Sequence, residues 1–166
     1  WRSRQTRSVS HICLLMKAKK RMNGMENVLV PFDESKSARR AIQYLIDRAE
    51  LFAGQKLHVI NVQDEVKVFG DCLTQSMIDE MHESAIAYSS EYTTSAAAML
   101  KGTGLRFETH ELIGDAPTEI AKAVKEYDCH LVVMGTRGMS KLGNLLMGSV
   151  ATRVIHEVDV PVLLVK

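Results

Sequence analysis

A glycine-rich stretch at residues 135–149 holds the residue types best suited to binding a phosphorylated ligand. Its glycines stand at positions 135, 138, 143 and 148, where they let the backbone approach a ligand and expose amide N–H groups to anions. Gly148 and Ser149 open a predicted helix, whose first N–H groups are unpaired and lie at the positive end of the helix dipole. We therefore predict that a phosphate chain binds here.

Three polar side chains of this stretch add to the prediction. The Ser149 hydroxyl is placed to donate a hydrogen bond to a phosphate, while Arg137 and Lys141 supply positive charge. For Ser149 the alternative is a plain helix N-cap that binds no ligand.

The two common nucleotide motifs are absent from the sequence. Gly143 and Gly148 have the spacing of a P-loop, but Ser149 occupies the position of the lysine that this motif requires. No GxGxxG occurs either. Gly102 and Gly104 lack the third glycine and follow a predicted helix, so they are predicted to form a turn.

The glycine-rich stretch is positioned by strands and helices that alternate along the chain. Short apolar runs predict strands at residues 28–30, 57–62, 105–112, 130–134 and 160–165. Helical spacing of apolar residues predicts helices at residues 38–49 and 74–101, from Asp115 onward and around residues 150–155. The long second helix has an apolar stripe that we expect to pack into the core, namely Met77, Met81, Ala85, Tyr88, Tyr92, Ala96 and Met99.

This alternation predicts an α/β fold with a five-stranded, doubly wound parallel sheet and helices on both faces, which is Rossmann-like. The more polar strand 105–112 suits a sheet edge. Open parallel sheets bind ligands beyond the carboxyl ends of their strands, where the strand order reverses. Two loops are equipped for this role, one containing Asp33 after the first strand and the other at residues 135–149.

The spacing of the glycines resembles that of a known family. Gly135, two residues, Gly138, nine residues and then Gly148-Ser149 match the universal stress protein pattern of GxxG followed by G[ST]. The resemblance covers about residues 25–166 and includes Val30-Pro31-Phe32-Asp33 after the first strand. It points to the ATP-binding branch of this family, and so to a nucleotide-binding module of stress-response regulation.

The resemblance implies roles for individual residues. Asp33 would lie at the ribose and metal side of the site, reaching Mg through the phosphates, and the backbone near Val62 would contact adenine. The role of Arg137 rests on its charge alone. For Asp33 the alternative is a loop carboxylate that caps the following helix. With Arg137 added for its charge, the whole predicted nucleotide site is Pro31, Asp33, Val62, Met134, Gly135, Arg137, Gly138, Gly148, Ser149 and Val150, with ATP and Mg as the ligands.

The last strand is the expected dimer contact. The family commonly pairs through this strand, and residues 160–165, from Val160 to Val165, form an apolar edge. Pro161 has no amide donor, so that edge is only partly available for pairing. We therefore expect a homodimer.

Charge is distributed unevenly along the chain. The net charge is +1, but residues 1–24 contain seven Lys or Arg and no acid, which leaves 14 basic against 20 acidic residues from Met25 onward. We predict that residues 1–24 are a basic leader outside the domain, either an artificial extension or misassigned start or else a transit peptide, and that residues 25–166 form a single domain. An acidic body, in a chain with only nine aromatic residues, argues against nucleic acid as a partner. No apolar run is long enough to cross a membrane.

Residues for catalysis or a metal site do not stand out. Three widely spaced cysteines show no zinc or disulfide pattern and suit the reducing cytoplasm. We expect packing or surface roles for all the histidines, which are His11, His58, His82, His110, His130 and His156. No GxSxG elbow occurs, and no activating carboxylate or glutamine lies near residues 135–149 in the sequence.

A nucleotide-binding protein is therefore the preferred prediction. The alternatives are a slow Mg-dependent ATPase and a dimeric interaction protein that binds no nucleotide. A relative of electron-transfer flavoproteins or of adenylating enzymes is a further alternative. The adenylating enzymes place a glycine-rich loop after the first strand, whereas residues 31–37 contain no glycine.

Overall fold

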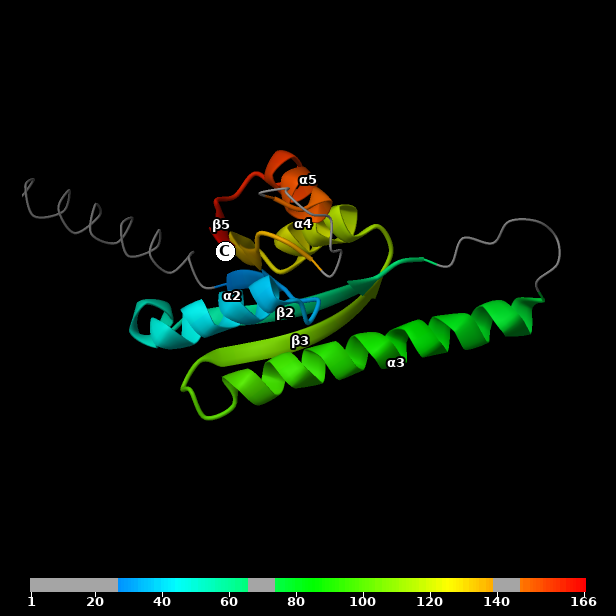
Figure 1. The fold of residues 1–166 in the computed structure, drawn as a ribbon, viewed down its shortest axis with the longest axis horizontal. Coiled ribbons are helices and arrows are strands. Elements are labelled where there is room, and N and C mark those ends of the chain that lie inside the picture. Colours follow the sequence, from blue (N-terminus) through cyan, green and yellow to red (C-terminus); the bar gives the residue numbers. More distant parts are fainter. Residues whose placement is uncertain (1–26, 66–73, 139–146) are drawn as a thin grey trace, which may run out of the picture.

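A parallel sheet lies between two layers of helices in the computed structural model, which describes residues 27–65, 74–138 and 147–166 (Figure 1). Within these residues the strands are β1 (Asn27–Pro31), β2 (Lys56–Gln63), β3 (Arg106–Ile113), β4 (Cys129–Gly135) and β5 (Val162–Val165). The helices are α2 (Lys36–Asp47), α3 (Gln75–Leu100), α4 (Ala116–Glu126) and α5 (Ser149–Glu157), with a short 3₁₀ helix η1 at Ala49–Phe52. The strand order is β3-β2-β1-β4-β5, and all pairs are parallel. The predicted fold class is confirmed, and β3 is an edge strand as predicted.

The two faces of the sheet belong to two separate apolar cores. Alternate residues of a strand point to opposite faces, so neighbouring valines and leucines of one strand enter different cores. Val28 and Val30 of β1 pack with α2 and α3, whereas Leu29 packs with α4 and α5. Strands buried on both faces explain the continuous apolar runs in the sequence.

Side-chain caps define where three of the helices begin. Ser35, Thr74 and Asp115 each accept a hydrogen bond from the backbone N–H three residues later, at the starts of α2, α3 and α4. At the other end of the α2 region, Gly54 has a φ of 91°, a left-handed conformation that glycine adopts without strain. These local signals set where α2, α3 and α4 begin and where the chain turns after η1.

The long helix α3 departs from its predicted packing. Met77, Met81 and Tyr88 are exposed, whereas Tyr92, Ala96 and Met99 of the predicted stripe do lie in or against the core. The buried residues of the helix are Ser89, Thr93, Ala96 and Leu100. A helix of 26 residues is about 39 Å long, whereas the eight-residue strands β2 and β3 reach only about 26 Å. The first half of α3 therefore extends past the sheet, as Figure 1 shows, and the prediction of a continuous core stripe was wrong.

The start of the last strand differs from the prediction. The last strand begins at Val162 rather than Val160, because Pro161 offers the ladder no N–H and contributes only its carbonyl, which accepts from Val132. The predicted leader at residues 1–24 lies outside the described residues. Among the helices that are described, we find none with the length and apolar character needed to span a bilayer.

Candidate functional site

A cavity of about 290 Å³ opens at the carboxyl ends of β1, β2 and β4 and at the start of α5. It lies at the reversal of strand order, since the chain runs from β1 outward to β2 and β3 and then returns to place β4 on the other side of β1. This is where open parallel sheets bind their ligands. The volume is near the lower limit of about 300 Å³ for small-molecule pockets, so the cavity suits a small ligand.

The structure brings all ten residues of the predicted nucleotide site to this one cavity. They come from four separate parts of the chain, and they are Pro31, Asp33, Val62, Met134, Gly135, Arg137, Gly138, Gly148, Ser149 and Val150. Lys141, which was predicted to add charge, lies outside the described residues.

The start of the glycine-rich loop is attached to the start of α2. The Ser35 hydroxyl donates to the carbonyl oxygen of Arg137 at 3.1 Å, and the Ser37 hydroxyl donates to the same oxygen. A β-carbon at Gly135 would lie 2.6 Å from the backbone carbon of Ser37, which is too close for any other residue type. Gly135 is thus required by helix packing, whatever ligand the cavity holds.

The end of the loop presents an uncapped helix terminus. Gly148 is the N-cap of α5, and no side chain bonds to the first amides of this helix in the described structure. The Gly148 N–H donates to the Thr136 carbonyl at 2.8 Å, which holds the two ends of the loop together. Ser149 is the first helical residue, so the alternative role as N-cap was wrong for it. The first amides of α5 point where an anion would bind.

Asp33 lies against the loop and does not cap a helix. One of its carboxylate oxygens, Oδ1, accepts from the Ser35 N–H at 3.1 Å, and the N-cap of α2 is Ser35 itself. The other oxygen, Oδ2, would be 2.8 Å from a β-carbon at Gly138. The capping alternative for Asp33 was therefore wrong, and glycine at 138 leaves room beside this carboxylate.

Polar residues at the end of β2 were missed by the sequence interpretation. The Asn61 amide donates to the Phe32 carbonyl at 2.7 Å, and the Gln63 amide donates to the Asn61 side-chain oxygen at 2.7 Å. Gln63 and Asp64 both line the cavity. The available signal was their place at the end of an apolar strand. The absence of a carboxylate or glutamine near the loop thus holds for the sequence but not for the fold.

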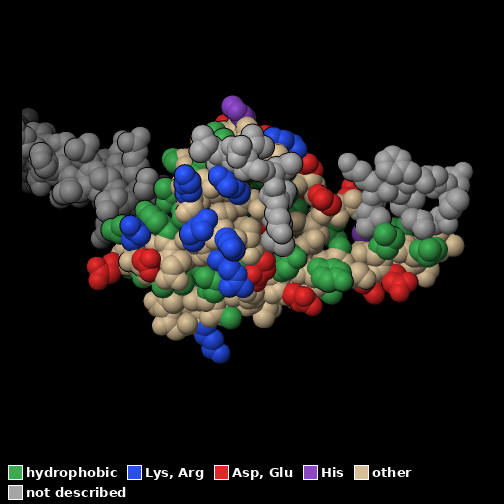
Figure 2. Space-filling model, in the orientation of Figure 1, with side chains coloured by type: hydrophobic (Ala, Val, Ile, Leu, Met, Phe, Trp, Pro, Cys, Tyr) green, Lys and Arg blue, Asp and Glu red, His purple; other side chains and the backbone are tan. Residues whose placement is uncertain are grey.

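Positive charge surrounds one side of the loop. Arg137 is exposed, and the exposed residues Lys36 and Arg40 lie on α2, whose start is bonded to the loop. Arg39 of the same helix is exposed but paired with Glu34. Figure 2 shows Lys and Arg side chains gathered over this face of the molecule. Such a group of cations attracts anions toward the neighbouring cavity.

Residues 24–166 match the sequence model of the universal stress protein family. The chain belongs to the universal stress protein family. A relative from Thermus aquaticus, also a universal stress protein, is 31% identical over 143 residues, which is 85% of this chain and 98% of the relative. A relative from Methanocaldococcus jannaschii is 29% identical and covers 87% of this chain and 84% of its own length.

Solved structures of universal stress proteins share the fold. UspA from Lactobacillus plantarum superposes with a TM-score of 0.73 at 19% identity, covering 86% of this chain and 98% of its own. A family member from Arabidopsis thaliana, solved with AMP bound, has a TM-score of 0.61 at 18% identity, covering 85% of this chain and 91% of its own. The Archaeoglobus fulgidus protein in complex with dAMP has a TM-score of 0.54 at 23% identity, covering 86% of this chain and 98% of its own.

The site of this universal stress protein has distinct apolar and polar regions. Ile60, Val62, Ile120 and Met134, which belong to one apolar cluster, give the cavity an apolar wall suited to a flat ring. The start of α5 and the loop backbone form a second part suited to an anion, and Asp33 lies at its border. A ligand with a ring at one end and phosphates at the other would satisfy both.

Proposed function

We propose that this universal stress protein is a nucleotide-binding module of stress-response regulation, which binds ATP with Mg²⁺ and whose state depends on the bound nucleotide. The observation that carries the proposal is the uncapped start of α5 beside Gly138 and Asp33, in the same cavity as an apolar wall. The complexes of relatives with AMP and dAMP support an adenine nucleotide as the ligand class.

The residues present fit a nucleotide with a divalent cation. The α5 amides would bind phosphate oxygens, and the Ser149 hydroxyl would add one hydrogen bond. The Asp33 carboxylate beside this anion site would repel phosphate by itself, so a cation between them is favourable. When bound, Mg²⁺ would neutralise that repulsion, and Asp33 would orient it directly or through water.

Two properties of the whole protein complete the proposal. A homodimer would form through β5, which is an edge strand with half-buried valines and leucines. The cytoplasm is the proposed location, because the chain shows no disulfide pattern and Cys129 is a free, buried thiol.

Calorimetric titration tests the proposed binding. Mg-ATP is titrated into the wild-type chain and into Gly148→Val. Mg-GTP is titrated separately for comparison. A β-carbon at Gly148 would meet Arg137, Gly138 and Thr136 only at ordinary contact distances of 3.5 to 3.6 Å, so the variant should fold while its side chain narrows the anion site. We expect micromolar binding of Mg-ATP that is lost in the variant.

The matched control is Ala98→Val, which adds the same methyl groups on the exposed face of α3. Its affinity should equal that of the wild type. Asp33→Asn should bind ATP with little dependence on Mg²⁺. Folded wild-type protein that binds neither nucleotide would overturn the proposal.

Slow hydrolysis of ATP is a second candidate, favoured by one observation. Gln63 and Asp64 line the cavity, and such side chains can orient an attacking water. Phosphate release at saturating Mg-ATP measures it. We expect a slow rate that falls in Gln63→Ala or Asp64→Asn, and an unchanged rate in both would exclude these residues as the source.

A further inference from the structure

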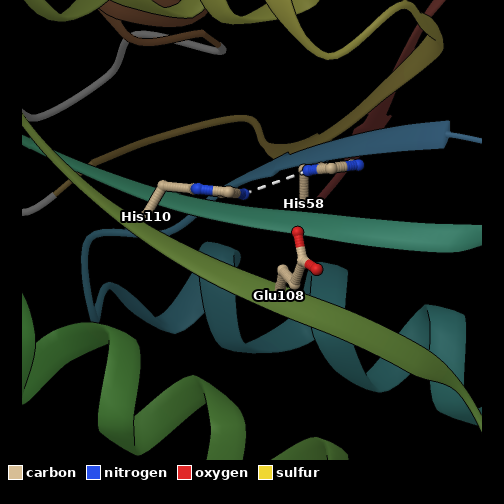
Figure 3. Close-up of side chains that lie close together, drawn as sticks. All are labelled: His58, Glu108 and His110. Atoms are coloured by element: carbon tan, nitrogen blue, oxygen red, sulfur yellow. Dashed lines mark hydrogen bonds between the residues drawn. The ribbon is translucent and has the colours of Figure 1, made fainter.

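A cluster of two histidines and a glutamate lies on the sheet away from the nucleotide cavity. His58 is on β2, and Glu108 and His110 are on β3 (Figure 3). The register pairs His58 with Glu108 and Ile60 with His110, so all three side chains leave the same face of the sheet. None of them lines the cavity described above.

The donor atoms of the cluster are close enough to share one ion. His58 Nδ1 and His110 Nε2 are 3.0 Å apart. One ligand atom from each of His58, Glu108 and His110 lies within 4.8 Å of the other two. Tetrahedral zinc with bonds of about 2.1 Å separates its ligand atoms by about 3.4 Å. To reach that spacing, the two nitrogens must separate slightly and the carboxylate oxygen must move inward by up to about 1.4 Å.

We propose that His58 Nδ1, His110 Nε2 and Glu108 form a binding site for a zinc-class transition-metal ion. Imidazole and carboxylate donors suit Zn²⁺, Co²⁺, Ni²⁺ and Cu²⁺, whereas Mg²⁺ and Ca²⁺ prefer oxygen ligands alone. Three protein ligands leave a fourth position for water, the arrangement of an open zinc site.

The surroundings hold the two imidazoles in place for binding. His58 is 5% exposed, and the Tyr127 ring at the end of α4 stacks on both, with centroids 4.8 Å from His58 and 4.3 Å from His110. Burial lowers the pKa of His58 and of His110, and this direction favours the neutral form of both rings. A metal ligand must be in this neutral form.

Binding of the ion requires a defined rearrangement of protons. In the metal-free state one ring donates a single hydrogen bond to the other between Nδ1 of His58 and Nε2 of His110. On loading, each ring carries its one proton on the opposite nitrogen, His58 on Nε2 and His110 on Nδ1. No proton need leave the pair, because the ring that donates the hydrogen bond only changes its tautomer, while the acceptor ring already carries its proton on the other nitrogen.

A lysine competes with the ion for the carboxylate. Lys56 Nζ lies 2.5 Å from Glu108 Oε1, and this contact also lowers the pKa of Glu108. Removing the ammonium group frees Glu108 and takes one positive charge away from a divalent cation. The proposal therefore predicts one substitution that strengthens binding beside two that weaken it.

The experiment is a titration of the full chain with Co²⁺ and with Zn²⁺, following cobalt absorption and heat. We expect one ion to bind through this cluster in the wild type. Loss of a ligand in His110→Asn should weaken binding by about 100-fold or more, and Glu108→Gln should weaken it by about ten-fold. Lys56→Gln should tighten it several-fold. Excess Mg²⁺ should not displace the ion.

His156→Asn is the matched control, since His156 is exposed on α5. It should bind the ion as the wild type does, and circular dichroism should show that every variant is folded. Glu108 is half-exposed, so its substitution keeps the test decisive if His110→Asn misfolds. Equal affinity in the wild type and in Glu108→Gln, or no binding by the wild type at millimolar ion, would overturn the proposal.

Discussion

Ser35 and Ser149 stand near the starts of two helices that flank the same cavity, and they do different things. The Ser35 hydroxyl caps α2 and bonds to the Arg137 carbonyl, whereas Ser149 is the first residue of α5 and caps nothing. Ser35 therefore has a structural role, whereas for Ser149 we propose a role in ligand binding.

Substitution of each serine by alanine should separate these roles. Ser35→Ala should lower the free energy of unfolding by about 1 to 2 kcal/mol, since it removes a helix cap and a bond between loops. Ser149→Ala should change it by less than about 0.5 kcal/mol. The same Ser149→Ala should weaken Mg-ATP binding about ten-fold, the effect of losing one hydrogen bond to a charged group.

Urea unfolding and calorimetry measure the two effects. If Ser149→Ala destabilised the fold as much as Ser35→Ala did, then Ser149 would have a structural role that its position in α5 does not indicate.

At the scale of elements, α4 and α5 are joined by an ion pair that makes stability depend on pH. Both guanidinium nitrogens of Arg153 donate to Asp115, at 2.8 and 2.9 Å. This contact, with the Thr118 hydroxyl bond next in importance, lowers the pKa of Asp115 to about 2. The stabilisation is complete above about pH 4 and is lost as the pH falls toward 2.

Asp115→Asn should isolate this contribution, because asparagine also caps helices well. We expect the variant to melt at a lower temperature than the wild type at pH 6. The difference should shrink below pH 4 and vanish near pH 2, as calorimetric scans across this range would show. A difference that stayed constant down to pH 2 would mean that the charge of Asp115 is not its source.

The helix α3 has two halves with different support. Ser89, Thr93, Ala96 and Leu100 are buried against the sheet, while Met77, Met81 and Ile86 are exposed. Hydrogen exchange should therefore be faster at the amides of residues 79–86 than at those of residues 93–100, because local opening of the first half exposes no buried core. Equal protection along the helix would indicate that something covers the first half in solution.

Element boundaries followed from the sequence more reliably than burial did. The predicted helix 74–101 is observed at Gln75–Leu100, since Thr74 caps its start and Gly102 follows its end. The stripe of Met77, Met81 and Tyr88 has helical periodicity, but periodicity does not tell how far the neighbouring strands extend. For this reason the predicted burial of the first half of α3 was wrong.

At the scale of the whole molecule, the sequence indicated the site through one loop and the fold supplied the rest. The glycine spacing at 135–149 and the resemblance that it carries led to ten residues that line one cavity. Asn61, Gln63 and Asp64 join them only because β2 lies beside β1. His58 and His110 are 52 residues apart and meet only through the register of β2 and β3, so no local pattern indicated their contact.

The exposed edge of β5 leads us to predict a homodimer. Its half-buried Val162, Leu163, Leu164 and Val165 would be covered by a second copy of the chain. Light scattering after size exclusion should give a mass of about twice 18.5 kDa. A mass of one chain at all concentrations would exclude the proposed dimer, while leaving the nucleotide proposal intact.

The most direct test of nucleotide binding is a titration of ¹⁵N-labelled protein with Mg-ATP, followed by the backbone amide resonances. The amides of Gly138, Gly148, Ser149 and Val150 should show the largest shifts and should saturate together, because they lie at the loop and the start of α5. Those of His58 and His110 should move little. Largest shifts at amides far from the cavity, or no shifts at millimolar Mg-ATP, would contradict the proposed site.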